Sequence, residues 1–376
     1  MSDRRLRIAL IIPTLDRSGA ERQLALLACG LPKERYDVRV IALTRGGPYA
    51  EWLEAAGIPL VVLEKRMKFD PFALLRLRRE LRAFRPDVVH TWLFAANAYG
   101  RLISGAKRTW KVVVSERCVD SWKAGWQLWL DRRLIPRTDL LVGNSQAVAE
   151  FYRGLGVPAE KLRVVPNGVR IDAVPGDARS SVRRELGWPE NVPVVAYIGR
   201  LARQKRLEDL LWAFELLRVL RQRDCRFVIV GDGPERESLE RFAEQIGARD
   251  DVAFIGHRTD AARYLAASDL FWLASDFEGQ SNSLLEAMAL GVPVIASDIG
   301  PNREVIEPGV TGYLVPVGDR AAYSQTAQRL LENPAERERL RLAARDAVTR
   351  RHSVEGMVAA YAAVYDEVTG RGVPSA

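Results

Sequence analysis

Short apolar runs alternate with amphipathic stretches along almost the whole chain, and no other feature constrains the fold as strongly. In the first half, the runs expected to form buried strands are Leu6–Ile12, Val38–Leu43, Leu60–Leu63, Val88–His90, Lys111–Ser115 and Leu140–Gly143. In the second half they are Pro193–Ile198, Arg226–Val230, Val252–Ile255, Leu270–Ala274, Val292–Ala296 and Gly312–Val315. Helical patterns fill most of the gaps between these runs, which is typical of βα repeats. The sequence therefore predicts an α/β fold built on parallel sheets.

The length of the chain indicates two domains. A chain of 376 residues is too long for one ordinary core. The stretch Pro166–Ser181 holds an Asn-Gly pair, two prolines and further small polar residues, so it is the predicted linker. We expect one domain over residues 1–172 and a second over 173–352, with a C-terminal segment at 353–376 that begins with a helix over Val354–Val368.

Two glutamates eight residues apart, Glu278 and Glu286, mark the most informative segment. The polar turn Ser275–Asn282 follows a predicted strand, and a helix is expected over Ser283–Leu290 because Gly291 ends it. Free backbone amides at a helix start attract anions. The amides expected here belong to Ser281, Asn282 and Ser283. Amides that attract anions, flanked by two carboxylates, indicate a site for a sugar nucleotide.

Three further residues are candidates for contact with phosphate. Arg200 and Lys205 follow one predicted strand and precede a helix over Leu207–Leu217, where two cations can neutralise a diphosphate. The alternative is a solvated basic loop. Gly19 follows the first strand, where a glycine lets a ligand approach the backbone, although it is also explained as an ordinary loop glycine.

Several motifs occur together and in a fixed order. They are Ser18-Gly19-Ala20-Glu21-Arg22-Gln23, Asn167-Gly168-Val169, Gly199-Arg200-Leu201 with Gln204-Lys205, Gly231-Asp232-Gly233-Pro234, Phe254-Ile255-Gly256-His257 and the pair Glu278 and Glu286. This set resembles the retaining GT-B glycosyltransferases of glycosyltransferase family 4. The resemblance covers nearly the whole chain. It implies two Rossmann-like domains that face each other across a cleft, the first binding the acceptor and the second the nucleotide sugar. It also implies that the segment 353–376 crosses back to the first domain.

The resemblance further implies roles for the candidate residues. Glu286 would accept hydrogen bonds from the ribose hydroxyls, and Glu278 would lie beside the donor sugar as a catalytic residue. Arg200 and Lys205 would hold the diphosphate of a UDP- or GDP-type donor. The expected activity is transfer with retention to an acceptor hydroxyl in glycan or glycolipid synthesis. The alternatives are a binding protein of this fold without catalysis and a sugar-nucleotide epimerase of this fold.

No metal or cofactor is expected. The chain holds no Asp-x-Asp, and its His, Asp and Cys residues show no ligand spacing. Cys29, Cys118 and Cys225 lie far apart, which favours buried thiols in a reducing compartment over disulfides. We therefore expect a cytoplasmic protein.

His90 ends a predicted strand of the first domain and is a second catalytic candidate. A histidine at that place could bind the donor sugar or position the acceptor hydroxyl. The family often has another histidine two residues later, where this chain has Trp92. A core histidine with both nitrogens satisfied is the alternative.

Charge is distributed unevenly between the two halves. Residues 1–172 carry 30 Lys and Arg against 18 Asp and Glu, a net +12, and the remaining 26 and 30 give −4. The first half is therefore expected to meet an anionic partner. Nucleic acid is not expected, because no motif of that kind is present. A phospholipid surface or a polyprenyl-phosphate acceptor fits better, and the resemblance implies a glycan or lipid-linked acceptor.

A tryptophan stripe adds to that expectation. Trp122, Trp126 and Trp129 have the spacing of one helix face. Basic residues lie nearby, at Lys123, Arg132, Arg133 and Arg137, and a second basic stretch runs from Lys65 to Arg85. Indoles with basic neighbours suit a lipid headgroup region, so reversible association with an anionic membrane is one expectation. A wall of an acceptor pocket and an ordinary core face are the alternatives.

Overall fold

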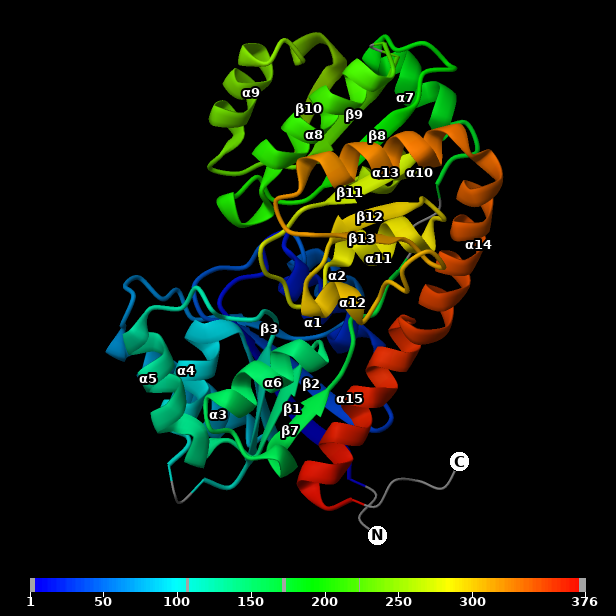
Figure 1. Ribbon diagram of the computed structural model, residues 1–376. Helices are drawn as coiled ribbons and strands as arrows, with labels where there is room; N and C mark the ends of the chain where they lie inside the picture. The colour runs from blue at the N-terminus through cyan, green and yellow to red at the C-terminus, as the bar shows by residue number, and fades with distance from the viewer. Residues whose placement is uncertain (1–3, 106–107, 171–173, 223, 372–376) are drawn as a thin grey trace. The chain divides into compact units, whose positions relative to one another are not determined.

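The computed structural model describes residues 4–105, 108–170, 174–222 and 224–371, which form two compact units (Figure 1). Unit 1 comprises Met1–Gly168 and Ser353–Ala376, and unit 2 comprises Val169–His352. The predicted boundary between residues 172 and 173 lies outside the described residues, and the units divide four residues earlier. Each unit is a parallel sheet with helices, so the predicted α/β fold class is confirmed.

The sheet of unit 1 has seven parallel strands in the order β3-β2-β1-β4-β5-β6-β7. Their bounds are β1 (Leu6–Ile12), β2 (Tyr36–Ala42), β3 (Leu60–Val62), β4 (Val88–Trp92), β5 (Lys111–Glu116), β6 (Leu140–Gly143) and β7 (Leu162–Val164). Alternate residues of β1 enter different hydrophobic cores, since Ile8 and Leu10 pack on one face while Ala9 and Ile11 pack on the other. Burial on both faces explains why the strands are continuous apolar runs.

The helices of unit 1 cover both faces of that sheet. Their bounds are α1 (Gly19–Gly30), α2 (Ala50–Ala55), α3 (Pro71–Phe84), α4 (Leu93–Ile103), α5 (Gly125–Leu134), α6 (Gln146–Gly154) and α15 (Val354–Thr369), with 3-10 turns η1 (Ile135–Arg137) and η2 (Ala159–Lys161). Helix α15 packs on α1 and contributes Tyr361 and Tyr365 to the core that contains Ile8 and Leu10. Helices α3 and α4 contribute to the core on the other face.

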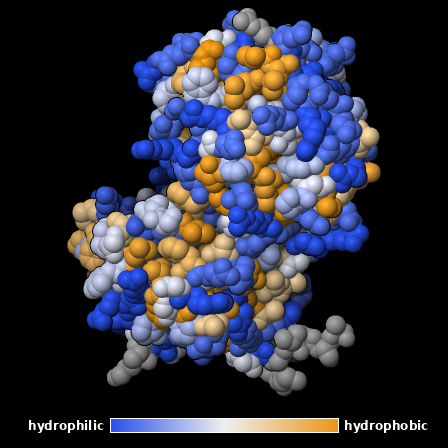
Figure 2. Space-filling model, viewed as in Figure 1, coloured by the Kyte–Doolittle hydropathy of each residue, from blue (hydrophilic) through white to orange (hydrophobic). Residues whose placement is uncertain are grey.

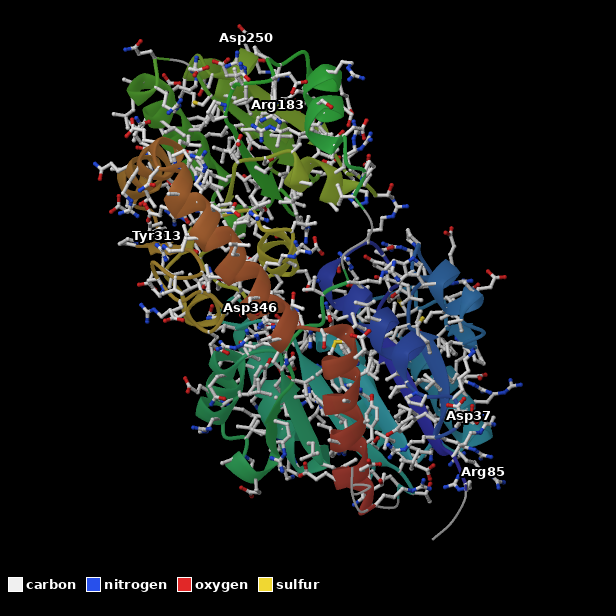
Figure 3. All side chains as sticks on the ribbon, turned by 90° about the vertical axis from the view of Figure 1, so that its right-hand side faces the viewer. Asp37, Arg85, Arg183, Asp250, Tyr313 and Asp346 are labelled. Carbon is white, nitrogen blue, oxygen red and sulfur yellow. The ribbon has the colours of Figure 1, made fainter. Side chains whose placement is uncertain are left out.

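Unit 2 has six parallel strands in the order β10-β9-β8-β11-β12-β13. Their bounds are β8 (Val194–Ile198), β9 (Arg226–Val230), β10 (Val252–Gly256), β11 (Leu270–Leu273), β12 (Val294–Ser297) and β13 (Tyr313–Val315). The helical segments are α7 (Ala178–Leu186), η3 (Arg203–Lys205), α8 (Leu207–Leu220), α9 (Arg236–Gln245), η4 (Arg249–Asp251), α10 (Ala261–Ala266), α11 (Asn282–Ala289), α12 (Gly300–Arg303), α13 (Arg320–Glu332) and α14 (Pro334–Arg351). Arg183 of α7 is fully buried and donates to the carbonyl of Ala267 at 2.7 Å (Figure 3).

In each sheet there is one point from which the strands follow the sequence outward in both directions, so the strand order reverses there. The reversal lies between β1 and β4 in unit 1 and between β8 and β11 in unit 2. Open parallel sheets bind ligands beyond the carboxyl ends of their strands at such a reversal. A binding site is therefore expected in the loops that follow β1, β4, β8 and β11.

The predicted strands are present within two residues at each end, but one strand was missed and two expectations about the tryptophans were wrong. Strand β7 was not predicted, because Leu-Arg-Val is too short to show a pattern. Trp122 lies in a turn before α5 rather than on its face, since the helix begins at Gly125. The core alternative for the tryptophans is also wrong, because Trp122, Trp126 and Trp129 are all exposed. None of the helices formed by the described residues is both long and apolar enough to span a bilayer.

Candidate active site

The loops after β8 and β11 are joined to each other in unit 2, at the place where the strand order reverses. The N–H of Asp276 donates to the carbonyl of Gln204 at 2.9 Å, and the side-chain amide of Gln204 donates to the carbonyl of Phe277 at 2.6 Å. These two bonds link residues some seventy positions apart. They hold the segment that carries Arg200 and Lys205 against the segment that carries Glu278.

Close backbone contact also fixes the loop after β8 against the loop after β9. The N–H of Leu201 donates to the carbonyl of Asp232 at 2.9 Å. A Cβ at Gly231 would lie 1.9 Å from the carbonyl oxygen of Gly199, and one at Gly233 would lie 2.2 Å from that of Leu201. Gly231 also has a φ of +143°, which L side chains rarely adopt. Both glycines of the Gly-Asp-Gly-Pro motif are therefore required for the two loops to meet.

Lys205 and Glu278, both predicted as site residues, are brought together. The ammonium group of Lys205 is hydrogen-bonded to Oε1 of Glu278. The hydroxyl of Ser275 donates to the same oxygen at 2.7 Å. The carboxylate is largely buried, so hydrogen bonds from both partners replace the water that it loses. This cluster places one positive and one negative group at the end of β11.

Arg200 and Arg206 occupy different environments in the same loop. Arg206 donates to Asp209 at 2.6 Å and to Asp276 at 2.9 Å, so it fixes the loop. Arg200 is exposed at the end of β8, and its carbonyl accepts a hydrogen bond of 3.0 Å from the hydroxyl of the buried Tyr197. Arg206 therefore stabilises the loop through its two ion pairs, whereas the side chain of Arg200 is accessible at the surface.

Helix α11 begins beside this loop with the expected polar residues. Ser281 is the N-cap, and its hydroxyl accepts a hydrogen bond from the N–H of Leu284 at 3.4 Å. Asn282 is the first helical residue and Ser283 the second, so their amides point out of the helix start. Glu286 is the fifth residue of α11 and is half-buried.

In unit 1, Gly19 is the exposed first residue of α1, at the end of the loop after β1. Two residues later, Glu21 is buried and bonds to the hydroxyls of Ser18 and Thr14. Burial raises the pKa of Glu21, and the hydrogen bond from Ser18 partly offsets this effect. The side chain of Gln23 makes two hydrogen bonds with the backbone of Gly168 in the Asn-Gly motif. Its Nε2 donates to the carbonyl at 2.8 Å, and its Oε1 accepts from the N–H at 3.0 Å.

His90 lies in the centre of the sheet of unit 1 and is fully buried. Its Nδ1 is 2.8 Å from the hydroxyl of Tyr365, and its Nε2 is 2.8 Å from the hydroxyl of Ser115. Burial lowers the pKa of His90 well below its usual value, and the nearby Arg117 lowers it further. This is the geometry of the core-histidine alternative.

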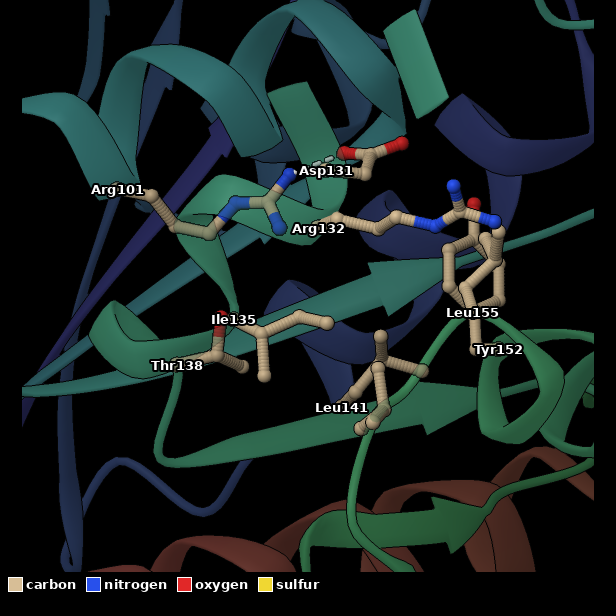
Figure 4. A pocket seen from close by; sticks show the side chains of 9 residues that line it. Arg101, Asp131, Arg132, Ile135, Thr138, Leu141, Tyr152 and Leu155 are labelled. Carbon is tan, nitrogen blue, oxygen red and sulfur yellow. Dashed lines mark hydrogen bonds and ion pairs between the residues drawn. The ribbon is translucent and has the colours of Figure 1, made fainter. Parts of the chain in front are cut away.

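A small cavity in unit 1 is the wrong size for a substrate. Its volume is about 10 Å³, about enough for one water molecule. It is lined by Arg101, Asp131 and Tyr152 among others, and Figure 4 shows the ion pair between the first two. Among the described residues, no group of three or more His, Cys, Asp or Glu side chains is arranged to hold a metal ion.

Sequence reasoning did not select Ser275 or Tyr197 as contributors to the site. Ser275 donates to the Glu278 carboxylate, and Tyr197 holds the backbone of Arg200. Polar residues at the ends of β8 and β11 were a usable signal for both. Their partners depend on loop conformation, which the pattern of residue types does not specify.

The fold and the site define the class of this protein. Two units of parallel sheet, each with one reversal of strand order, form the GT-B fold. The family model "Glycosyl transferases group 1" matches residues 178–347, and "Glycosyltransferase Family 4" matches residues 17–173. The chain belongs to the glycosyltransferase family that these two models describe, one for each unit, and is a glycosyltransferase.

Curated relatives agree with that assignment. The chain is 30% identical over 295 residues to the GDP-mannose-dependent alpha-mannosyltransferase of Mycobacterium tuberculosis, a match that covers 73% of this chain and 72% of that enzyme. It is 28% identical over 349 residues to the lipopolysaccharide core biosynthesis glycosyltransferase LpsD of Rhizobium meliloti, covering 93% and 95%. A match to N-acetyl-alpha-D-glucosaminyl L-malate synthase of Bacillus anthracis, 30% identical, spans 62% of this chain and only 61% of that enzyme.

Solved structures show the same fold at lower identity. The crystal structure of Anabaena HepE in complex with UDP-glucose aligns with a TM-score of 0.87 and 23% identity, covering 96% of this chain and all of that one. Sucrose-phosphate synthase from Thermosynechococcus elongatus aligns with a TM-score of 0.83 and 20% identity, covering 98% of this chain and all of that one.

We predict that Gly231→Ala destabilises unit 2. A methyl group there meets the Gly199 carbonyl at 1.9 Å and forces an unfavourable φ, so the free energy of unfolding should fall by roughly 2–3 kcal/mol. Gly176→Ala is the matched control, since a Cβ at that position meets nothing within 4 Å. Denaturant unfolding of both variants measures the difference, and equal stabilities would contradict the close contact.

We predict that His90 makes stability depend on pH. Its pKa of about 6.5 in the unfolded chain is lowered in the folded state, so its neutral form favours folding above that pH and the gain is lost as pH falls below it. The melting temperature of the native protein should therefore drop more steeply below pH 6.5 than that of His90→Gln. Parallel melting curves for the two proteins across this range would contradict the buried neutral ring.

Proposed function

We propose that this glycosyltransferase moves a sugar from a UDP- or GDP-type donor to an acceptor hydroxyl, with retention at the anomeric carbon, in glycan or glycolipid synthesis. One observation carries the proposal: Lys205 and Glu278 are paired at the end of β11, beside the start of α11. At one reversal of strand order, a cation and outward amides suit a diphosphate, and a carboxylate suits the hydroxyl groups of a sugar.

The diphosphate is assigned to three groups of unit 2. Arg200 and Lys205 offer charged donors, and the amides of Asn282 and Ser283 add the positive end of the helix dipole. These groups stabilise the negative charge that grows on the leaving phosphate, an effect that is strongest where water is excluded. The proposal therefore needs no metal ion and no cofactor.

The two glutamates have separate roles in the proposal. Glu286 on α11 accepts hydrogen bonds from the ribose hydroxyls. Glu278 lies beside the donor sugar and orients it, while its hydrogen bonds to Lys205 and Ser275 hold the carboxylate in one position. When a diphosphate binds, Lys205 can serve the phosphate and Glu278 together, since it carries three N–H donors.

The chemical step uses the donor itself as the base. The bond from the anomeric carbon to the phosphate oxygen breaks with its electron pair moving to the phosphate. The acceptor oxygen then bonds to the same face of that carbon, and its proton passes to the departing phosphate oxygen. No protein nucleophile is needed, so Glu278 acts as a positioning group. Unit 1 is proposed to supply the acceptor, a glycan or a lipid-linked sugar.

Supporting evidence comes from relatives that act on such donors. The mycobacterial relative is named as GDP-mannose-dependent, and the aligned Anabaena protein was crystallised with UDP-glucose. The relative from Rhizobium is named for lipopolysaccharide core biosynthesis. The two alternatives weighed from the sequence, a binding protein without catalysis and an epimerase of the same fold, would differ from a transferase in their products.

We predict donor-specific turnover that depends on Arg200. The protein, incubated in EDTA with UDP-, GDP- and ADP-sugars and a polyprenyl-phosphate-linked acceptor, should release nucleotide from one donor. Arg200→Ala should lower kcat/KM about a hundredfold by removing a diphosphate contact. Glu286→Gln should lower it about tenfold by weakening the ribose contact. Arg203→Ala is the control, because Arg203 is an exposed cation of the same loop without an assigned role.

Three results would contradict parts of this proposal. Binding of a donor without release of nucleotide would indicate a binding protein. A product sugar nucleotide with altered stereochemistry would indicate an epimerase. Inversion at the anomeric carbon of the transferred sugar, read from its proton coupling constant, would contradict the retaining step.

A further inference from the structure

Two segments of unit 1 expose large hydrophobic side chains. The first segment runs into α3 and exposes Met67, Phe69, Phe72 and Leu75, each between 56% and 67% accessible. The second segment leads into α5 and exposes Trp122, Trp126 and Trp129, each between 54% and 62% accessible. We call these seven side chains the hydrophobic surface of unit 1. Single exposed hydrophobic residues are ordinary, but a group of this size marks an interaction site.

The second segment buries charged side chains and exposes its indoles, the opposite of the usual distribution in a soluble protein. Lys123, which lies between the indoles in sequence, is almost completely buried and bonds to Asp131 at 3.0 Å and to the hydroxyl of Tyr152 at 2.7 Å. Asp131 belongs to α5 and is buried as well, while Trp126 and Trp129 of that helix face outward. A segment that buries its charges and exposes its indoles loses hydrophobic stabilisation in water. The arrangement is explained if the indoles meet an apolar partner.

The first segment likewise buries a charged side chain and exposes hydrophobic ones. Asp70 is buried and caps α3, accepting from the N–H of Ala73 and that of Arg66 at 3.0 Å each. Its neighbours Phe69 and Phe72 point away from the core. The backbone around these phenylalanines is therefore held firmly by the cap, and their exposure is built into the fold.

Both segments lie beside α4. Helices α3 and α5 each pack against α4. Trp126 contacts Phe94 of α4 with ring centroids 5.6 Å apart, and Lys65 lies 5.7 Å from the ring centre of Tyr99 on the same helix. Figure 2 shows hydrophobic side chains gathered at the edge where Figure 1 draws α5 and the turn before α3. The seven side chains therefore belong to one side of unit 1.

Exposed arginines surround this surface. Helix α3 exposes Arg76, Arg78, Arg79 and Arg82, and α5 exposes Arg132 and Arg133. The first 172 residues carry a net charge of +12. Hydrophobic side chains that enter the headgroup region, with arginines that meet lipid phosphates, are the two elements of interfacial membrane binding.

We propose that the hydrophobic surface of unit 1 docks the chain on an anionic lipid bilayer. The aromatic rings enter the headgroup region, and the arginines of α3 and α5 bind the lipid phosphates. This inference deepens the proposed function, because a lipid-linked acceptor would be met at the same surface. Its test nevertheless needs neither a nucleotide sugar nor an acceptor, so either idea can fail alone.

The test is co-sedimentation of the full chain with vesicles of phosphatidylglycerol and phosphatidylcholine, compared with phosphatidylcholine alone. Binding to the anionic vesicles should be at least about tenfold stronger. The double variants Trp126→Ala/Trp129→Ala and Phe69→Ala/Phe72→Ala should each lower that binding about tenfold or more. The charge variant Arg78→Glu/Arg79→Glu should remove the preference for anionic lipid.

The matched control is Val219→Ala/Leu220→Ala, which removes two exposed hydrophobic side chains from α8 of unit 2 and should leave vesicle binding unchanged. All these side chains are exposed, so melting temperatures should stay close to that of the native protein. Failure of the native chain to bind anionic vesicles, or equal binding by the tryptophan variant, would overturn the proposal. So would a shift from dimer to monomer in that variant without vesicles, which would assign the surface to a second copy.

Discussion

The contact between the loops that follow β8, β9 and β11 is the constraint on which the candidate site depends. A side chain at Gly231 would overlap the Gly199 carbonyl, and the amide of Gln204 closes the same loop against Phe277. These contacts involve mostly backbone atoms, so they fix the path of the loop after β8. The position of Lys205 in that loop is fixed as a consequence. The site is thus prepared by local geometry before any ligand arrives, which lowers the entropic cost of binding.

An ion pair at this position has two consequences for chemistry. Lys205 stabilises the buried Glu278 carboxylate, and Glu278 holds the ammonium group where a diphosphate would be bound. Breaking a buried pair by removing one partner leaves an uncompensated charge, so both residues are constrained together.

Much of the fold could be predicted from the sequence, because parallel strands buried on both faces leave continuous apolar runs. The motif residues Arg200, Lys205 and Glu278 could also be named, since their order follows the strands. The bond between Lys205 and Glu278 could not, because it depends on loops 73 residues apart in the chain. His90 shows a second limit, since a pattern does not reveal that two hydroxyls occupy its nitrogens. At Trp126 the periodicity identified a helix face but not that the face points outward.

Hydrogen exchange of the full chain with and without UDP or GDP is the measurement to make first for the donor site, because it locates a bound nucleotide without requiring turnover. We expect slower exchange in peptides that cover residues 199–206 and 275–290, where the two loops and the start of α11 meet. Exchange slowed only elsewhere, or unchanged at saturating concentrations of both nucleotides, would contradict the assignment of the donor site to these loops.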